Sequence, residues 1–173
     1  MYLAPHAGLS GYLSTIPEGT AGTFATVERM RALVTEWRVN PQIINAARSI
    51  VFMEPAKNDL AEARAVFRWV QRTVRYVRDV LGVETLATPL ATLETRSGDC
   101  DDHATLLATL LESIGFETRF VLASYSDPTS FEHVYLTVLI TTGAQPAWMF
   151  ADTTERGPFG WHAENPLLFH VER

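Results

Sequence analysis

The stretch "SGDCDDHATLLATLLESIGF", residues 97–116, contains the only cysteine of the chain and carries the pattern on which the fold depends. Its apolar positions recur at helical spacing, at Ala104, Leu107, Leu111 and Ile114. Cys100 lies four residues before Ala104, so it falls on the same stripe at the first turn. Gly115 is suited to end the helix. The spacing predicts a helix from about Cys100 to Ser113, with the thiol at its N-terminal end and facing the body of the protein.

The position of Cys100 allows two interpretations. Backbone N–H groups at a helix N-terminus stabilise a thiolate, and the thiolate is the nucleophilic form of cysteine. Free cysteine is also among the most frequently buried residues, which favours a structural role. The neighbouring Asp99, Asp101 and Asp102 oppose a thiolate, so a reactive Cys100 requires a nearby cation, and a histidinium would suffice.

Composition narrows the class of protein. A chain of 173 residues that is 47% hydrophobic is long enough for one core, and we predict a single domain over 1–173. The net charge of -6 argues against a general nucleic-acid binder. One cysteine cannot form an internal disulfide, and no stretch approaches the ~18 apolar residues of a membrane span. These features predict a cytoplasmic protein without a membrane segment.

The segment before the cysteine is predicted to be mainly helical. Residues 1–22 read as an irregular N-terminal arm, and residues 23–79 as a helical part. Three helices are expected there: Thr23 to about Val39, Pro41 to about Val51, and Asp59 to about Val77, the last opened by a capping-box pattern. Residues 82–97 lack a helical period and are expected to be an extended loop or short strand.

The second half of the chain predicts strands. Residues 116–124 alternate in polarity, residues 132–140 are rich in β-branched and aromatic side chains, and residues 147–151 follow after a short connection. Short connections between successive strands favour an antiparallel sheet. Helices followed by strands are the α+β pattern.

Five histidines are candidates for a base that activates Cys100. His6, His162 and His170 lie in the arm or near the end of the chain, and His103 is expected to be a partly exposed helix residue. His133 lies near the start of a strand. If Ile140 pairs with Ala147, Asp152 falls diagonally beside His133, and a shift of two residues places it directly opposite. Either register leaves the carboxylate and the imidazole on one face of the sheet.

Three motifs in this order resemble the transglutaminase-like superfamily: "TRSGDCDDHATLLATLLESIGFETRFVLAS", "FEHVYLTV" and "WMFADTT". The resemblance covers roughly residues 60–161. It implies a papain-like core, with the catalytic part over residues 98–161, and catalytic roles for Cys100, His133 and Asp152. Many relatives have a proline directly after the aspartate, whereas Thr153 and Thr154 follow here. The chain also resembles short stand-alone members of this superfamily that phages and prophages encode.

The resemblance implies a cysteine-dependent amide hydrolase or acyltransferase that acts on a protein or peptide through a thioester. No metal or cofactor is expected, because "CDDH" has no matching second pair of zinc ligands. The alternative is a structural or assembly protein with an unused triad, associated with a virion and bound to phage structural proteins. A third alternative is a binding module that uses an arginine-rich helix face: Arg64, Arg68, Arg72, Arg75 and Arg78.

Overall fold

The computed structural model describes residues 11–12, 20–78, 85–141 and 145–172. His6 and most of the predicted arm lie outside the described residues, as do residues 82–84 of the predicted loop. The elements within the described residues are β1 (Gly11–Tyr12), α1 (Thr20–Trp37), α2 (Pro41–Val51), α3 (Asp59–Thr73), β2 (Arg75–Tyr76), β3 (Leu86–Ala87), α4 (Pro89–Thr95), β4 (Ser97–Gly98), α5 (Cys100–Ser113), β5 (Thr118–Ser124), β6 (His133–Ile140), β7 (Ala147–Ala151) and β8 (Leu168–Val171).

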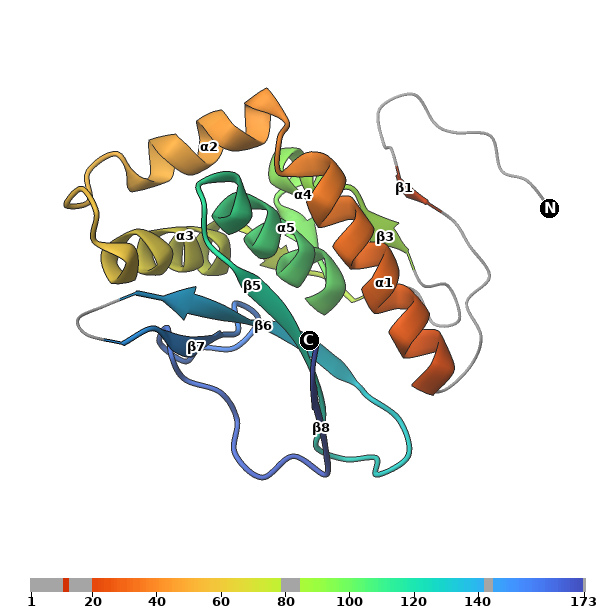
Figure 1. The fold of residues 1–173 in the computed structure, drawn as a ribbon. Helices are drawn as coiled ribbons and strands as arrows, with labels where there is room; N and C mark the ends of the chain where they lie inside the picture. The colour runs from red at the N-terminus through yellow and green to blue at the C-terminus, as the bar shows by residue number, and fades with distance from the viewer. Residues whose placement is uncertain (1–10, 13–19, 79–84, 142–144, 173) are drawn as a thin grey trace.

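A four-stranded antiparallel sheet forms one layer of the α+β fold, in the order β7-β6-β5-β8. The helices gather on one face of this sheet (Figure 1). Alternate residues of β5 face the two sides, so Phe120 and Leu122 join the main core while Val121 and Ala123 pack on the opposite face. Both the α+β class and the predicted alternation of this strand are confirmed.

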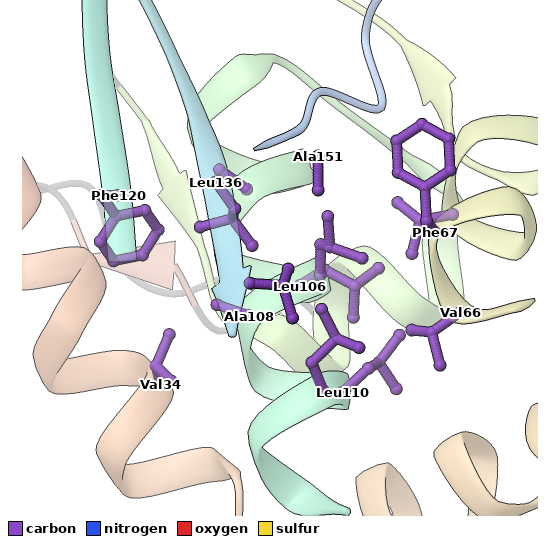
Figure 2. Packing of buried hydrophobic residues seen from close by; sticks show 14 of the residues in the cluster. Val34, Val66, Phe67, Leu106, Ala108, Leu110, Phe120, Leu136 and Ala151 are labelled. Atoms are coloured by element: carbon purple, nitrogen blue, oxygen red, sulfur yellow. The ribbon is translucent and has the colours of Figure 1, made fainter. Parts of the chain in front are cut away.

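Helix α5 lies at the centre of the helical layer, surrounded by α1, α2, α3 and α4 and packed on β6. All ten residues from Asp102 to Leu111 are buried. Figure 2 shows its Leu106 and Leu110 among side chains from α3 and β6, including Val66 and Leu136. Burial of each fully buried leucine stabilises the fold by roughly 2 kcal/mol. This packing fixes the helix, and with it the position of Cys100.

Local hydrogen bonds explain where two of the surrounding helices begin. The N–H of Gln42 donates to Oδ1 of Asn40 at 2.8 Å, and Pro41 occupies the first position of α2. At α3 the cap is Asn58, whose Oδ1 accepts from the N–H of Ala61 at 3.1 Å. The capping box was predicted to begin at Asp59. The residue that caps α3 is Asn58, so the prediction is wrong by one residue.

Several predicted boundaries are also wrong. Helix α1 begins at Thr20, inside the predicted arm. Helix α3 ends at Thr73 rather than near Val77, because the residues after it form β2, which pairs in parallel with β4. Arg75 and Arg78 are therefore not on the predicted helix face. Residues 89–95, expected to be extended, form α4. Strand β8 was not predicted.

No helix in the described part of the chain combines the length and the apolar character that crossing a membrane requires.

Candidate active site

Cys100 is the first residue of α5, and the chain around it is tightly constrained. The N–H groups of Asp101 and Asp102 donate to Oδ1 of Asp99, at 3.1 and 3.4 Å, so Asp99 caps the helix. A Cβ atom at Gly98 would lie 2.4 Å from Cβ of Asp102, closer than real contacts permit. Only glycine fits there without displacing Asp102. The "SGDC" sequence thus serves the local geometry that presents the thiol.

Asp102 has a structural role in this arrangement. Its side chain is buried, with 6% of the residue exposed, and its Oδ1 accepts from the N–H of Ala87 at 2.9 Å. This bond joins the start of α5 to the segment that leads into α4. A buried carboxylate with a backbone donor is satisfied where it lies.

The thiol of Cys100 is partly buried and lies against the main core. Its Sγ donates to Oδ1 of Asp101 over 3.5 Å. Burial is the main reason that the pKa of Cys100 is raised, and the charges of Asp101 and Asp99 raise it further, while a backbone hydrogen bond with Val134 acts in the opposite direction. The prediction that the neighbouring aspartates oppose a thiolate is confirmed for Asp101 and Asp99.

His133 and Asp152 meet across the β6–β7 hairpin. Ile140 pairs with Ala147, which is the first of the two predicted registers. Nε2 of His133 lies 2.7 Å from Oδ2 of Asp152, whose residue is only 4% exposed. This bond leaves Nδ1 as the ring nitrogen that can exchange a proton with a thiol.

Thr154 holds the other oxygen of Asp152. Its N–H and its Oγ1 donate to Oδ1 of Asp152, at 3.1 and 2.7 Å. Burial alone would raise the pKa of Asp152. The hydrogen bond and the charge of His133 lower it, as do the two hydrogen bonds from Thr154, and the net shift is downward. Asp152 is therefore ionised at neutral pH, and Thr154, two residues after it, fixes its orientation.

Cys100 and His133 line one pocket of about 310 Å³. Its walls come from α1, the β2 region, the start of α5, β5, and β6 with the chain leading into it: Thr23, Thr26, Val27, Met30, Tyr76, Arg78, Asp99, Cys100, Asp101, Leu122, Phe131, Glu132, His133 and Val134. No hydrogen bond joins Cys100 to His133 among the described residues. The pocket therefore brings thiol and imidazole to one cavity without a direct bond between them.

The loop before His133 is held by its own side chains. Glu132 accepts from the hydroxyls of Ser124 and Ser126, at 2.8 and 2.5 Å. Asp127 accepts from the N–H and hydroxyl of Thr129, at 2.7 and 2.6 Å. The pKa of the Asp127 carboxyl is held at about 2 by hydrogen bonds from Ser130 and Thr129, and that of Glu132 at about 2 by those from Ser126 and Ser124. Both carboxyls are therefore ionised at neutral pH.

His103 was expected to be partly exposed, and this expectation is wrong. The residue is 2% exposed, because α5 is enclosed on every side. Nδ1 lies 3.1 Å from Oγ1 of Thr153, and buried Nε2 has no hydrogen-bond partner among the described residues. Burial lowers the pKa of His103 to about 4, although the charge of Asp152 acts in the opposite direction. No feature of the sequence distinguished it from an edge position of the helix.

His162 and His170 lie outside the pocket's lining. The ring of His162 packs on Phe150 with centroids 3.8 Å apart, and the ring of His170 contacts Phe24 at 5.1 Å.

Asp99, Cys100 and Asp101 place three atoms of the kinds that bind metals within 4.8 Å of one another. The cap made by Asp99 and the thiol bond of Asp101 account for this grouping. The absence of a metal stays a prediction.

Comparison with known proteins finds similarity over this same region. Residues 46–153 match the family model described as "Transglutaminase-like superfamily". No curated protein sequence matches significantly. A "Putative Cysteine Protease" from Cytophaga hutchinsonii has a TM-score of 0.55 at 15% identity, over 83% of this chain and 55% of that chain.

Two further solved structures are similar. A "putative protease" from Parabacteroides distasonis ATCC 8503 has a TM-score of 0.56 at 12% identity, over 78% of this chain and 26% of that chain. Calcium-bound LapG of Legionella pneumophila has a TM-score of 0.49 at 14% identity, over 83% of each chain. This chain thus spans about half and about a quarter of the first two proteins, and at these identities the likeness shows the fold. The similarity to phage-encoded members stays a prediction.

Proposed function

Because this chain belongs to the transglutaminase-like superfamily, we propose that it is a cysteine-dependent amide or peptide hydrolase or acyltransferase that acts through Cys100, His133 and Asp152. One observation carries the proposal: the thiol shares a pocket with an imidazole whose far nitrogen is held by a buried carboxylate. These are the three groups that such a reaction needs: a nucleophile, a base and an orienting group.

In the proposed reaction, Nδ1 of His133 accepts the proton of the Cys100 thiol, and the thiolate attacks the carbonyl carbon of an amide. The imidazolium then donates its proton to the departing amine, which leaves a thioester on Sγ. Attack by water releases an acid and restores the thiol, whereas attack by a second amine forms a new amide. A protein or peptide is the proposed substrate, with no cofactor.

The start of α5 supplies the proposed stabilisation of the tetrahedral intermediate. The carboxylate of Asp99 accepts from the N–H groups of Asp101 and Asp102, so neither of these bonds uses the N–H of Cys100. That N–H and the helix dipole are directed toward developing negative charge on the substrate oxygen.

Asp152 has two proposed roles. Its bond to Nε2 fixes the tautomer and orientation of His133, and its charge stabilises the imidazolium. The second role matters here because the carboxylates beside Cys100 oppose the thiolate. We expect Asp152→Asn to lower turnover far more than it lowers stability.

The test is an acyl-transfer assay with a labelled amine and a glutamine-containing protein, scored for both incorporation and cleavage. The wild type should give at least one product, and Cys100→Ala and His133→Ala should give neither. His162→Ala is the matched control, because His162 lies outside the pocket's lining, and it should retain activity. Absence of both products in the wild type would refute the proposal.

A structural or assembly protein with an unused triad is the second candidate. The raised pKa of the Cys100 thiol and its bond to Asp101 rather than His133 favour it. The rate of thiol alkylation against pH separates the two candidates. A rate at neutral pH that depends on His133 supports catalysis. A rate that rises only at high pH and is unchanged in His133→Ala supports the structural role.

A further inference from the structure

The carboxylate of Asp152 lies beyond the paired part of its strand. Strand β7 is at the edge of the sheet, and Ala151 is the last of its residues that pairs with β6. Asp152 follows directly, and Thr153 and Thr154 come next. The pairing of β7 with β6 therefore ends before the turn that carries the carboxylate, and other contacts are needed to hold this turn in place.

His103 of α5 makes such a contact. Its Nδ1 lies 3.1 Å from Oγ1 of Thr153, in a hydrogen bond that joins residues 50 positions apart in the chain. Both partners are almost fully buried, because His103 is 2% exposed and Thr153 is 5% exposed. A hydrogen bond in such a water-excluded place is stronger than the same bond in water.

His103 also belongs to the helix that presents the thiol. It lies one turn after Cys100 in α5, so a bond that holds His103 constrains the start of the helix as well. The thiol has a contact of its own with the sheet, a backbone hydrogen bond with Val134 of β6. The start of α5 is thus joined to β6 through Cys100 and to the turn after β7 through His103.

The surroundings of His103 argue against a role in proton transfer. Nδ1 is engaged with Thr153, Nε2 is buried without a hydrogen-bond partner among the described residues, and the side chain is not part of the pocket's lining. Its pKa of about 4 leaves the ring neutral at neutral pH, and either neutral tautomer can make the bond to a hydroxyl. A neutral, buried imidazole can hold a neighbour in place without exchanging protons with a substrate.

A directional contact matters at this junction because apolar packing is not directional. Helix α5 packs on the sheet through residues such as Leu106, beside Leu136 of β6 (Figure 2). Among the described residues no hydrogen bond joins Cys100 to His133, so the surrounding structure sets their separation. A displacement of about 1 Å between reacting groups can cost about a hundredfold in rate.

We propose that His103 is a positioning residue: its hydrogen bond to Thr153 joins the turn that carries Asp152 to the helix that carries Cys100, and so keeps the imidazole of His133 within reach of the thiol. The inference rests on the proposed function, because what His103 maintains is the assistance that His133 gives to Cys100. That assistance is measurable without turnover.

The test uses alkylation of Cys100, the only cysteine in the chain. The thiolate displaces iodide from iodoacetamide and forms a thioether, which intact-protein mass spectrometry follows with time. The assistance ratio is the alkylation rate at neutral pH divided by the rate in an otherwise identical His133→Ala protein. In the wild type this ratio should be about ten or more, since a nearby opposite charge lowers the pKa of a thiol by about one unit or more.

Two variants remove the bond, one from each side. Thr153→Val keeps the shape of threonine without its hydroxyl, and His103→Leu removes the ring nitrogen. Each should lower the assistance ratio about fivefold or more, and the double variant should be no lower than the single ones, because all three lack the same bond. Thr153→Ser and His103→Asn can keep a hydrogen bond and should keep the ratio.

Thr109→Val is the matched control, because it removes another buried hydroxyl from α5 itself. Thr109 is 0% exposed, and its Oγ1 donates to the carbonyl of Thr105 at 2.7 Å, within the helix. This variant should keep the assistance ratio. Thermal unfolding establishes that each variant is folded. A merely structural role of His103 would lower the melting temperature of Thr153→Val and leave its assistance ratio equal to that of Thr109→Val.

In the acyl-transfer assay, Thr153→Val should lower kcat about tenfold and change KM less than about twofold, because the variant alters the alignment of the reacting groups rather than the lining of the pocket. Thr153→Ser should recover most of the lost kcat.

An unchanged assistance ratio in either folded variant that lacks the bond would overturn the inference. A wild-type ratio near one would overturn it as well, because there would be no assistance to maintain, and so would an equal fall in Thr109→Val. Any of these results together with turnover in the acyl-transfer assay would overturn the inference alone. A ratio that falls in both variants, without turnover in the wild type, would overturn the proposed function alone.

Discussion

Replacing the buried His103 is expected to make the protein less sensitive to acid. The pKa of His103 is about 4 in the folded protein, against about 6.5 for an unperturbed histidine. The unfolded state therefore binds a proton that the folded state does not accept until the pH is much lower. His103 favours folding fully above pH ~6.5, and this contribution is lost as the pH falls from there toward 4. From about pH 7.5 to about pH 5, the loss in the free energy of unfolding is about 2 kcal/mol.

The assay is urea denaturation of the wild type and His103→Asn at both pH values. The asparagine amide reaches nearly the position of Nδ1, so it can keep a bond to Thr153, but it does not titrate. The variant should lose about 2 kcal/mol less than the wild type over this range. Comparing each protein with itself cancels any packing cost of the substitution. Equal losses in the two proteins would refute the reasoning, and so would an NMR titration of His103 with a pKa near 6.5.

Three further outcomes are expected. Arg31→Met should lower the free energy of unfolding by about 2 kcal/mol, because Arg31 donates to Glu112 at 2.6 Å and the Glu112 side chain is only 9% exposed; a loss below about 0.5 kcal/mol in urea would contradict this. Gly98→Ala should destabilise by about 1–3 kcal/mol, since the new Cβ displaces Asp102; an unchanged melting temperature would show that the turn relaxes freely. Cys100→Ser should melt within about 3 °C of the wild type, because the thiol is at a helix end; a fall above about 6 °C would instead favour the buried structural role of this residue.

The hairpin that carries His133 was predictable except for the choice between two registers. Side chains alternate along a strand, so a register either joins His133 and Asp152 on one face or separates them entirely. The sequence left two registers open, both with His133 and Asp152 on one face, and the structure has the one in which Ile140 pairs with Ala147. Local sequence therefore predicted that His133 and Asp152 share a face, but not which of the two registers forms.

Short elements were not predictable from periodicity. Helix α4 has seven residues, too few to display a helical period, although Thr88 and Pro89 are typical of a helix start. Strand β2 interrupts a sequence whose spacing is helical, because Arg75 and Tyr76 pair with residues of β4 some twenty positions later. Tertiary pairing overrides local propensity at such places.

The surroundings of α5 limited what its sequence could reveal about the site. An amphipathic pattern predicts one packed face, but this helix is packed on all faces, so His103 was assigned to the wrong environment. The position of Cys100 followed from helical spacing. The bond from its thiol to Asp101 depends on rotamers and had no signal in the sequence.

His133 and Asp152 are brought together by one hairpin, whereas Cys100 comes from a helix earlier in the chain. The imidazole and the carboxylate therefore belong to one local unit of the sequence, and the thiol belongs to another. A lineage that loses the thiol through a single codon change keeps the pre-paired imidazole and carboxylate beside the same pocket. Under the proposed function, replacement of residue 100 alone would give a descendant that binds without reacting, while the hairpin stays unchanged.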